Sequence, residues 1–217
     1  HNHFPSLLPV EICAIRLFHE FAHPWHGIHP GEQAPELLTA YIEIVPLDTV
    51  KFELDKTTGH LIIDRPQQYS SLCPTPYGFI PRTYCGDGIA ALARAKNKKI
   101  EKGDGDPLDI CVLAEATITR SDILLRARPI GGLRLIDRGE ADDKIIAVMR
   151  GDALFDACTD IKHIPETLLD RLRHYFLTYK QIPGAGPRAV EIAEIYGVET
   201  AHEVIRVAMN DYRVSYT

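Results

Sequence analysis

The sequence predicts a β-rich α+β fold, in which short strands form a barrel or a sandwich that helices flank. From residue 40 apolar and polar residues alternate, which is the spacing of half-buried strands. From residue 164 the apolar residues recur at helical spacing. A chain of 217 residues can bury a substantial core, so residues 1–217 are expected to form a single domain.

Residues 1–39 are expected to form an amino-terminal extension, with a helix followed by a loop rich in Pro, Gly and His. His23 and His26 flank Trp25, but no third ligand stands at a set spacing, so a packed loop is favoured over a zinc site. We expect neither a secretory signal nor a membrane span, because there is no cationic leader and no apolar run of about 20 residues.

Alternation predicts strands in "AYIEIVP" at 40–46, in "VKFELDK" at 50–56, and in "HLIIDR" at 60–65 after a Thr58-Gly59 turn. Further strands are expected near 108–114, 123–130, 132–137 and 144–149. Because side chains alternate along a strand, Lys51 and Glu53 share one face. Glu43 can join them from the preceding strand, although a solvated sheet face would also explain these charges.

Helical spacing predicts a helix in "IPETLLDRLRHYFLTYKQI" at 164–182, where Pro165 suits the first helical position and Pro183-Gly184 ends the run. A last helix is expected to start at Thr200, an N-cap residue with Glu203 three residues later. Residues 85–102 are expected to be an insert on the surface. Their stretch "IAALARAKNKKIEK" predicts a short, solvated, basic helix.

Two acidic clusters stand at the boundaries of predicted strands. Asp104, Asp106 and Asp109 lie in "EKGDGDPLDIC", and a second cluster lies in "IDRGEADDK" at 136–144, which contains Asp137, Asp142 and Asp143. Solvated turns would hold these acids at little cost, and the second cluster is also explained as a charged hairpin loop. A metal site would require them, because Mg²⁺ prefers oxygen ligands and relieves the repulsion between close carboxylates.

Basic residues accompany these acids: Lys51, Arg65, Lys144 and Lys180 could bind a phosphate group. Acids that hold metals, beside cations that hold phosphate, indicate metal-assisted phosphoryl transfer. A calcium-binding EF-hand is excluded, because the sixth position counted from Asp104 is Asp109 rather than glycine.

The net charge of −6 argues against nucleic acid or anionic lipid as a partner. The chain has five cysteines at wide spacings and no CxxC, which argues against a disulfide framework and a zinc ribbon. Free thiols indicate a cytoplasmic protein. These cysteines are Cys13, Cys73, Cys85, Cys111 and Cys158.

The "DGDPLD" stretch resembles the D-x-D-P-x-D signature of the soluble family I inorganic pyrophosphatases. The family's other motifs follow in its order: "YIEIV", "KFELDKTTGHLIIDR", "YGFIP", Asp137-x₄-Asp142-x-Lys144, and Tyr179-Lys180. "HPWHGI" and "GEQAPE" are similar to the amino-terminal extension of longer members. The resemblance covers residues 23 to 181 and implies a five-stranded OB-like closed barrel with flanking helices.

The resemblance also implies Mg²⁺-dependent hydrolysis of pyrophosphate to two phosphates by direct attack of water, with Mn²⁺ or Zn²⁺ as substitutes for Mg²⁺. Asp106 matches the acid that accepts a proton from this water. The metal ligands would be Asp104, Asp109, Asp137, Asp142, Glu53 and Glu43. The groups that hold pyrophosphate would be Lys51, Arg65, Tyr77, Lys144, Tyr179 and Lys180. Family members form oligomers, so a homo-oligomer is expected.

One position departs from the family pattern, because Cys73 stands where members commonly carry tyrosine. Two other functions are alternatives. A non-catalytic OB-type module would need aromatic residues along a basic groove, whereas the predicted face is acidic. An enzyme that hydrolyses nucleotide polyphosphates would differ in its substrate.

Overall fold

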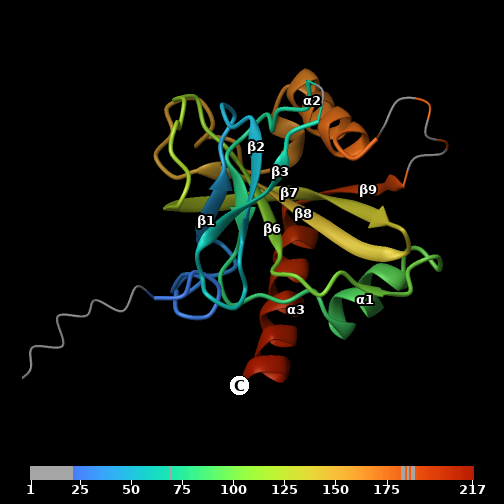
Figure 1. The fold of residues 1–217 in the computed structure, drawn as a ribbon. Helices are drawn as coiled ribbons and strands as arrows, with labels where there is room; N and C mark the ends of the chain where they lie inside the picture. The colour runs from blue at the N-terminus through green and yellow to red at the C-terminus, as the bar shows by residue number, and fades with distance from the viewer. Residues whose placement is uncertain (1–21, 69, 182–183, 185, 187–188) are drawn as a thin grey trace, which may run out of the picture.

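The computed structural model describes residues 22–68, 70–181, 184, 186 and 189–217 (Figure 1). The helix expected at the start of the amino-terminal extension lies outside these residues. So does Pro183, which was expected to end a helix. Within the described part of the chain, no helix is both long enough and apolar enough to cross a bilayer.

Five strands pair in a closed ring at the centre of the molecule. β1 (Leu38–Ile44) pairs antiparallel with β4 (Tyr77–Phe79), and β4 pairs antiparallel with β6 (Asp109–Leu113). β6 runs parallel to β8 (Glu140–Met149), β8 pairs with β7 (Ile123–Asp137), and β7 returns to β1. β5 (Lys102–Gly103) extends the ring beside β8, and β9 (Val190–Gly197) extends it beside β7. The predicted β-rich α+β class is confirmed.

β7 is one long strand, whereas the sequence predicted two strands at 123–130 and 132–137. Its register shifts between Pro129 and Gly131, which marks an irregularity inside a continuous strand. Because such a bulge bends a strand, the two halves of β7 can pair with different strands. Residues 123–127 pair with β1, and residues 131–137 pair with β9.

The second acidic cluster lies in a tight hairpin, most of whose residues belong to the strands rather than to the loop. β7 ends at Asp137 and β8 begins at Glu140, so only Arg138 and Gly139 form the turn. Both have positive φ values, 52° and 89°, as a two-residue hairpin turn requires. Asp142 and Asp143 therefore lie within β8, which starts earlier than the predicted strand at 144–149.

Two helices follow the ring. α2 (Glu166–Thr178) confirms the helix predicted at 164–182, although Pro165 precedes the first helical residue instead of occupying it. α3 (Val198–Tyr216) begins directly after β9, at Val198 rather than after an N-cap at Thr200. A short 3₁₀ turn, η1 (Ile161–His163), precedes α2. Figure 1 shows α2 and α3 on opposite sides of the ring.

The segment 85–102 is part of the core on one side, so the expectation of a solvated surface helix is wrong for that face. It contains α1 (Asp87–Arg94), whose Ile89, Ala90 and Ala93 are buried. Cys85 and Ile100, at the two ends of the segment, are buried as well. They join a cluster that includes buried residues of α3 and of the ring, so the segment packs against both.

Strands β2 (Val50–Leu54) and β3 (Leu61–Pro66) form a separate two-stranded sheet beside the ring. Residues of this hairpin line one side of the charged pocket described below. Leu54 anchors it, because this side chain is 4% exposed and packs with Trp25, Tyr41, Phe79 and Tyr212.

The start of α1 depends on a carboxylate from α3. Gly86, at the N-cap, has no side chain to cap the helix. Asp211 accepts N–H bonds from Gly86, Gly88 and Ile89, at 3.1, 3.1 and 3.0 Å. The approach is close, since a Cβ at Gly88 would lie 2.3 Å from Asp211 Oδ1.

Asp211→Ala is therefore expected to lower the free energy of unfolding by about 1–3 kcal/mol, because it leaves several partly buried N–H groups without an acceptor. Urea unfolding followed by circular dichroism measures this change. Asp170→Ala removes an exposed carboxylate that pairs with Arg173 and should stay within about 0.5 kcal/mol of the parent chain. Equal stability of the two variants would contradict a capping role for Asp211.

Candidate active site

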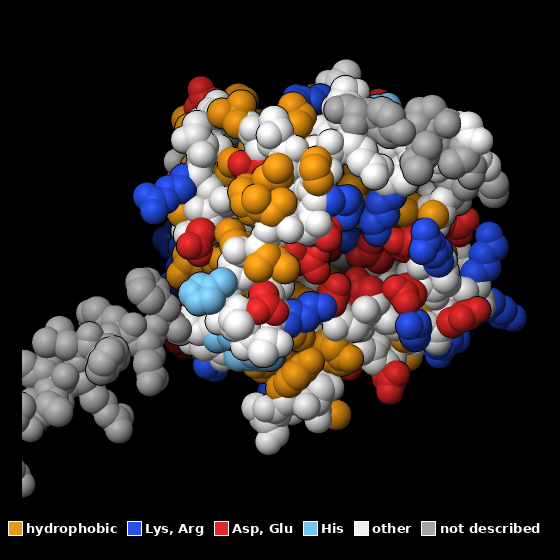
Figure 2. All heavy atoms as spheres, viewed as in Figure 1, with side chains coloured by type: hydrophobic (Ala, Val, Ile, Leu, Met, Phe, Trp, Pro, Cys, Tyr) orange, Lys and Arg blue, Asp and Glu red, His pale blue; other side chains and the backbone are white. Residues whose placement is uncertain are grey.

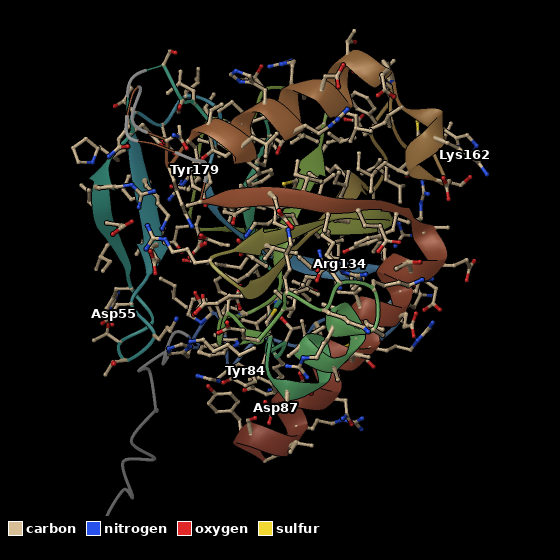
Figure 3. All side chains as sticks on the ribbon, turned by 90° about the vertical axis from the view of Figure 1, so that its right-hand side faces the viewer. Asp55, Tyr84, Asp87, Arg134, Lys162 and Tyr179 are labelled. Carbon is tan, nitrogen blue, oxygen red and sulfur yellow. The ribbon has the colours of Figure 1, made fainter. Side chains whose placement is uncertain are left out.

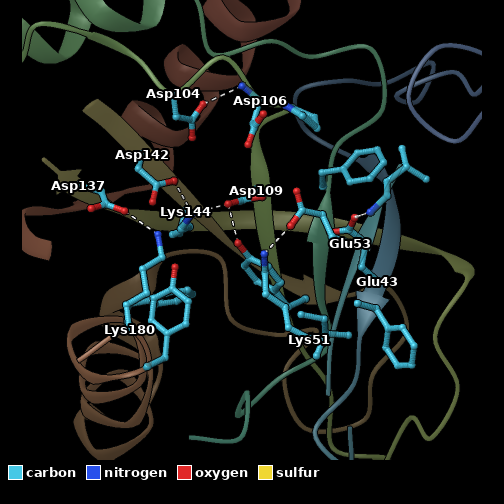
Figure 4. Close-up of a pocket in the computed structure, with 18 of the residues that line it drawn as sticks. Glu43, Lys51, Glu53, Asp104, Asp106, Asp109, Asp137, Asp142, Lys144 and Lys180 are labelled. Atoms are coloured by element: carbon cyan, nitrogen blue, oxygen red, sulfur yellow. Dashed lines mark hydrogen bonds and ion pairs between the residues drawn. The ribbon is translucent and has the colours of Figure 1, made fainter. Parts of the chain in front are cut away.

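One pocket brings together the charged residues that the sequence singled out (Figure 4). The hairpin β2–β3, the loop before β6, strand β8 and the end of α2 surround it. Figure 2 shows it as a hollow in which acidic side chains gather and basic side chains stand at the edges. Every predicted site residue except Arg65 lines the pocket: Glu43, Lys51, Glu53, Tyr77, Asp104, Asp106, Asp109, Asp137, Asp142, Lys144, Tyr179 and Lys180.

Lys144 is the buried cation of the pocket, with a side chain that is 3% exposed. Its ammonium group forms ion pairs with Asp109 and Asp142. The strands dictate this arrangement, because parallel pairing of β6 with β8 places Asp109 opposite Lys144. Asp142 lies two residues before Lys144 on the same face of β8. Burial lowers the pKa of this ammonium group, but the charges of Asp109 and Asp142 outweigh it and raise the pKa well above its usual value.

Asp143 points to the opposite face of β8, away from the pocket. Its carboxylate accepts a hydrogen bond from Tyr196 at 2.8 Å and lies 3.3 Å from the Nε of Arg134. Arg134 is 1% exposed and also pairs with Glu194 at 2.6 Å (Figure 3 labels Arg134). The acidic cluster read from the sequence is thus divided by strand alternation, and Asp143 serves a buried network behind the pocket.

Tyr77 and Asp109 meet across neighbouring strands of the ring. β4 pairs with β6, and the hydroxyl of Tyr77 donates to Asp109 Oδ2 at 2.6 Å. Burial raises the pKa of Tyr77 well above its usual value, and the charge of Asp109 adds to this. Tyr77 therefore stays protonated and acts as an uncharged donor.

The loop before β6 holds two acids in different surroundings. Asp104 Oδ1 accepts the N–H of Asp106 at 3.0 Å, across Gly105 with its φ of +77°. Burial raises the pKa of Asp104 well above its usual value, and Asp142 adds to this. Asp106 is more exposed, and its carboxylate forms an ion pair with Lys56.

On the β2–β3 hairpin, Lys51 and Glu53 lie close together, as expected for two residues on the same face of a strand. Lys51 Nζ lies 2.6 Å from Glu53 and 3.0 Å from Asp64. Arg65 lies opposite Lys51 in the register of β2 and β3, but its guanidinium is held by Asp64 at 2.6 Å. The structure therefore places Arg65 beside the pocket wall rather than in it.

Glu43 lies at the back of the pocket and is 8% exposed. It accepts the N–H of Leu54 at 2.7 Å, which ties β1 to the hairpin. Burial, followed by the charge of Asp109, raises the pKa of Glu43 to about 8. This carboxyl is ionised at neutral pH only where a cation comes close to it.

The end of α2 closes the pocket on the other side. Lys180 pairs with Asp137 at 2.6 Å, and Tyr179 stacks on Tyr175 with ring centroids 5.1 Å apart. Figure 3 shows Tyr179 at the end of α2, above β9. The second oxygen of Asp137, Oδ1, is buried without a hydrogen-bond partner.

Sequence reasoning missed several residues that line the pocket, among them Lys56, Glu140, Tyr175 and Phe176. Lys56 lies in the quoted "KFELDKTTG" stretch, but nothing in the sequence indicated its partner. Tyr175 lies beside Cys73, the position that departs from the family pattern, and the nearby thiol contributes to the raised pKa of Tyr175 after burial. The contact between Tyr175 and Cys73 could not be predicted from the sequence, in which the two residues lie far apart.

The donors in this pocket fit a hard divalent cation. They are carboxylate oxygens, they are crowded enough to raise one another's pKa, and Asp137 Oδ1 is a buried acceptor without a donor. Among the residues that the structure describes, no three acidic, His or Cys side chains converge on a single point as a coordination shell. Lysine ammonium groups hold several of these acids instead. The chemistry of the site therefore fits Mg²⁺.

Comparisons with known proteins give one answer. The family described as inorganic pyrophosphatase matches residues 40–213. An inorganic pyrophosphatase of Chlamydia muridarum is 53% identical over 195 residues, 88% of this chain and 93% of its own length. Soluble inorganic pyrophosphatase 2 of Chlamydomonas reinhardtii is 36% identical over 90% of this chain and 91% of its own length.

A crystal structure of inorganic pyrophosphatase from Thermus thermophilus superposes with a TM-score of 0.73 at 26% identity, over 88% of this chain and 99% of that one. The resemblance read from the sequence is confirmed by these matches. With its acids and lysines gathered in one pocket beside a ring of five strands, this chain belongs to the soluble family I inorganic pyrophosphatases.

Proposed function

We propose that the protein hydrolyses pyrophosphate to two phosphates, that it depends on Mg²⁺, and that water attacks directly. The observation that carries the proposal is the alternation of acids and lysines around one pocket. A pocket of acids alone would repel pyrophosphate, and a pocket of lysines alone could not hold a divalent metal. Both kinds of group are needed to bind a polyanion together with its metal ions.

In this proposal the basic residues and tyrosines hold the substrate. Lys144 and Lys180 come from β8 and from the end of α2, so they reach pyrophosphate from one side, while Lys51 reaches it from the hairpin. The hydroxyls of Tyr77 and Tyr179 add uncharged donors. Arg65 joins them if it exchanges Asp64 for a phosphate oxygen, to which its planar fork is suited.

Asp106 accepts the proton of the attacking water. It is the acid of its loop that stands closest to solvent, whereas Asp104 and Asp109 are more deeply placed. Bound Mg²⁺ would lower the pKa of the attacking water and offset the negative charge of the substrate. The residues that would hold it are Asp104, Asp109, Asp137, Asp142, Glu53 and Glu43.

Further parts of the proposal follow from the family and the fold. The ring of five strands is taken as the OB-like barrel, and residues 1–217 as one domain with an amino-terminal extension at 1–39. We place the protein in the cytoplasm as a homo-oligomer without nucleic acid or membrane as a partner. Free thiols at Cys73, Cys85, Cys111 and Cys158 support a reducing compartment.

The first test compares phosphate release from pyrophosphate and from ATP, each with and without Mg²⁺. Rapid release from pyrophosphate with Mg²⁺, slow release from ATP, and little from either after chelation are expected. Preference for ATP would overturn the proposed substrate, and full activity in excess chelator would overturn the metal dependence.

The second test concerns binding of the metal without turnover. Mg²⁺ should raise the melting temperature, because a ligand that binds only the folded state stabilises it. Asp109→Asn should reduce this gain, since the variant lacks one carboxylate of the proposed ligand set. Differential scanning fluorimetry across a Mg²⁺ titration measures both, with Asp170→Asn as an exposed control. Equal gains for Asp109→Asn and the control would argue against Asp109 as a ligand.

The third test separates two acids of one loop. Asp106→Asn should chiefly lower kcat, by about 10²- to 10⁴-fold, which is typical for loss of a general base. Asp104→Asn should chiefly raise the Mg²⁺ concentration needed for half-maximal activity. Steady-state kinetics over a range of Mg²⁺ give both values. Full recovery of Asp106→Asn in excess Mg²⁺ would show that Asp106 is a ligand instead.

A further inference from the structure

A turn that precedes residues 40–213, the span that the family comparison matches, contacts the edge of the active site. Residues 23–27, called here the amino-terminal turn, precede residue 40, where the match to the family begins. The N–H of Gly27 donates to the carbonyl of His23 at 2.7 Å and closes the turn. Trp25, in its middle, is 3% exposed. The turn is therefore a packed part of the protein.

On one side the amino-terminal turn holds the end of the β2–β3 hairpin, which Asp55 marks in Figure 3. Nδ1 of His23 accepts the N–H of Trp25 at 3.2 Å, so Nε2 carries the proton and donates to the carbonyl of Lys56 at 3.1 Å. Gly59 packs against the same histidine, since a Cβ there would lie 2.9 Å from His23 Cδ2. The hairpin end that carries Lys56 thus rests directly on the turn.

On the other side the amino-terminal turn is bonded to the segment that supports Asp106. Trp25 Nε1 donates to the carbonyl of Thr83 at 2.8 Å. The hydroxyl of Thr83 accepts the N–H of Leu108 at 2.9 Å, and the N–H of Cys85 donates to the carbonyl of Asp106 at 2.8 Å. The amino-terminal turn is therefore hydrogen-bonded both to the backbone of Lys56 and to the segment that holds Asp106.

The ion pair itself bridges the mouth of the pocket. Lys56 comes from the hairpin and Asp106 from the loop before β6, fifty residues apart in sequence. Their side chains are 42% and 46% exposed, so the pair contributes little to stability. Its effect on orientation is larger, because it restrains a carboxylate that has few other contacts.

We propose that Lys56 is a positioning residue for Asp106, and that the amino-terminal turn positions Lys56. This inference rests on the proposed function, in which Asp106 accepts the proton of the attacking water. A base must be held in the direction of that proton, and a loosely held base reacts more slowly. The amino-terminal extension thereby contributes to the rate without touching the substrate.

Lys56→Gln, Lys56→Arg and the control Lys99→Gln test the role of Lys56. Lys99 also forms an exposed ion pair, with Glu191, and does not line the pocket. Lys56→Gln is expected to lower kcat about two- to fivefold, the range given by an exposed pair. The KM for pyrophosphate, the half-maximal Mg²⁺ concentration and the melting temperature should not change. Lys56→Arg should restore most of kcat, and Lys99→Gln should match the parent chain.

His23→Ala and His23→Gln test the role of the turn. His23→Ala should lower kcat in part, and the double variant with Lys56→Gln should be no slower than Lys56→Gln alone, because both changes act through one contact. His23→Gln keeps a donor for the carbonyl of Lys56 and should recover activity. It also serves as the folded comparison if His23→Ala is unstable.

An unchanged kcat in Lys56→Gln would overturn the positioning role. A rise in KM alone would do so too, since it would show that Lys56 contacts the substrate. Independent, multiplicative effects of His23→Ala and Lys56→Gln, or failure of His23→Gln to recover activity, would remove the turn from the proposal. A parent chain that releases no phosphate from pyrophosphate would instead contradict the proposed function.

Discussion

The buried ammonium group of Lys144 is the interaction on which the pocket depends. It lies between Asp109 on β6 and Asp142 on β8, and its side chain is nearly inaccessible. Removal of one charge from such a group leaves a buried charge without a partner. The loss of stability is then larger than the net stabilisation that the intact pair provides. Neighbouring strands of the ring hold these residues in register, so the main-chain hydrogen bonds of the sheet fix the electrostatics of the site.

Around this centre, the pocket is arranged as pairs of opposite charge contributed by different elements. Lys180 of the α2 end meets Asp137 of β7, Lys51 meets Glu53 within the hairpin, and Lys56 meets Asp106. In the proposed reaction, Lys51 and Lys180 would exchange their carboxylates for phosphate oxygens, and the released carboxylates would turn to a metal ion. Lys56 would instead stay with Asp106 and keep that carboxylate in place.

Many of the strands, the helix α2 and the acidic residues of the site could be predicted from the sequence, because each depends on a local pattern of residues. The strands predicted at 40–46, 50–56 and 60–65 and the helix predicted at 164–182 correspond to β1, β2, β3 and α2. β1 is nevertheless buried on both faces rather than half-buried. The predictions that were wrong concern features that depend on tertiary contacts. The separation of Asp142 from Asp143 depends on both residues lying in β8 rather than in a loop. The segment 85–102 was expected to be solvated because of its basic residues, but all of these except Arg94 follow α1, whose Ile89, Ala90 and Ala93 are buried.

Other features had no signal in the sequence at all. Lys56 pairs with a residue fifty positions away, and Asp211 caps a helix more than a hundred positions before it. The sequence also did not indicate that Arg65 pairs with Asp64 and does not line the pocket. Such contacts follow from the way in which distant segments are brought together, which residue spacing does not encode.

The closure of the ring has a consequence for synthesis of the chain. β1 pairs with β4, but the ring closes only when residues 123–127 of β7 pair with β1, and β9 and α3 follow still later in the chain. Pairings between distant segments form slowly, because the chain loses the entropy of closing a long loop before the stabilising contacts form. Lys180, which borders the pocket, leaves the ribosome after most of the ring has emerged. In a growing chain, Asp137 is therefore synthesised well before Lys180, the cation with which it pairs, and the complete pocket is among the last features of the protein to form.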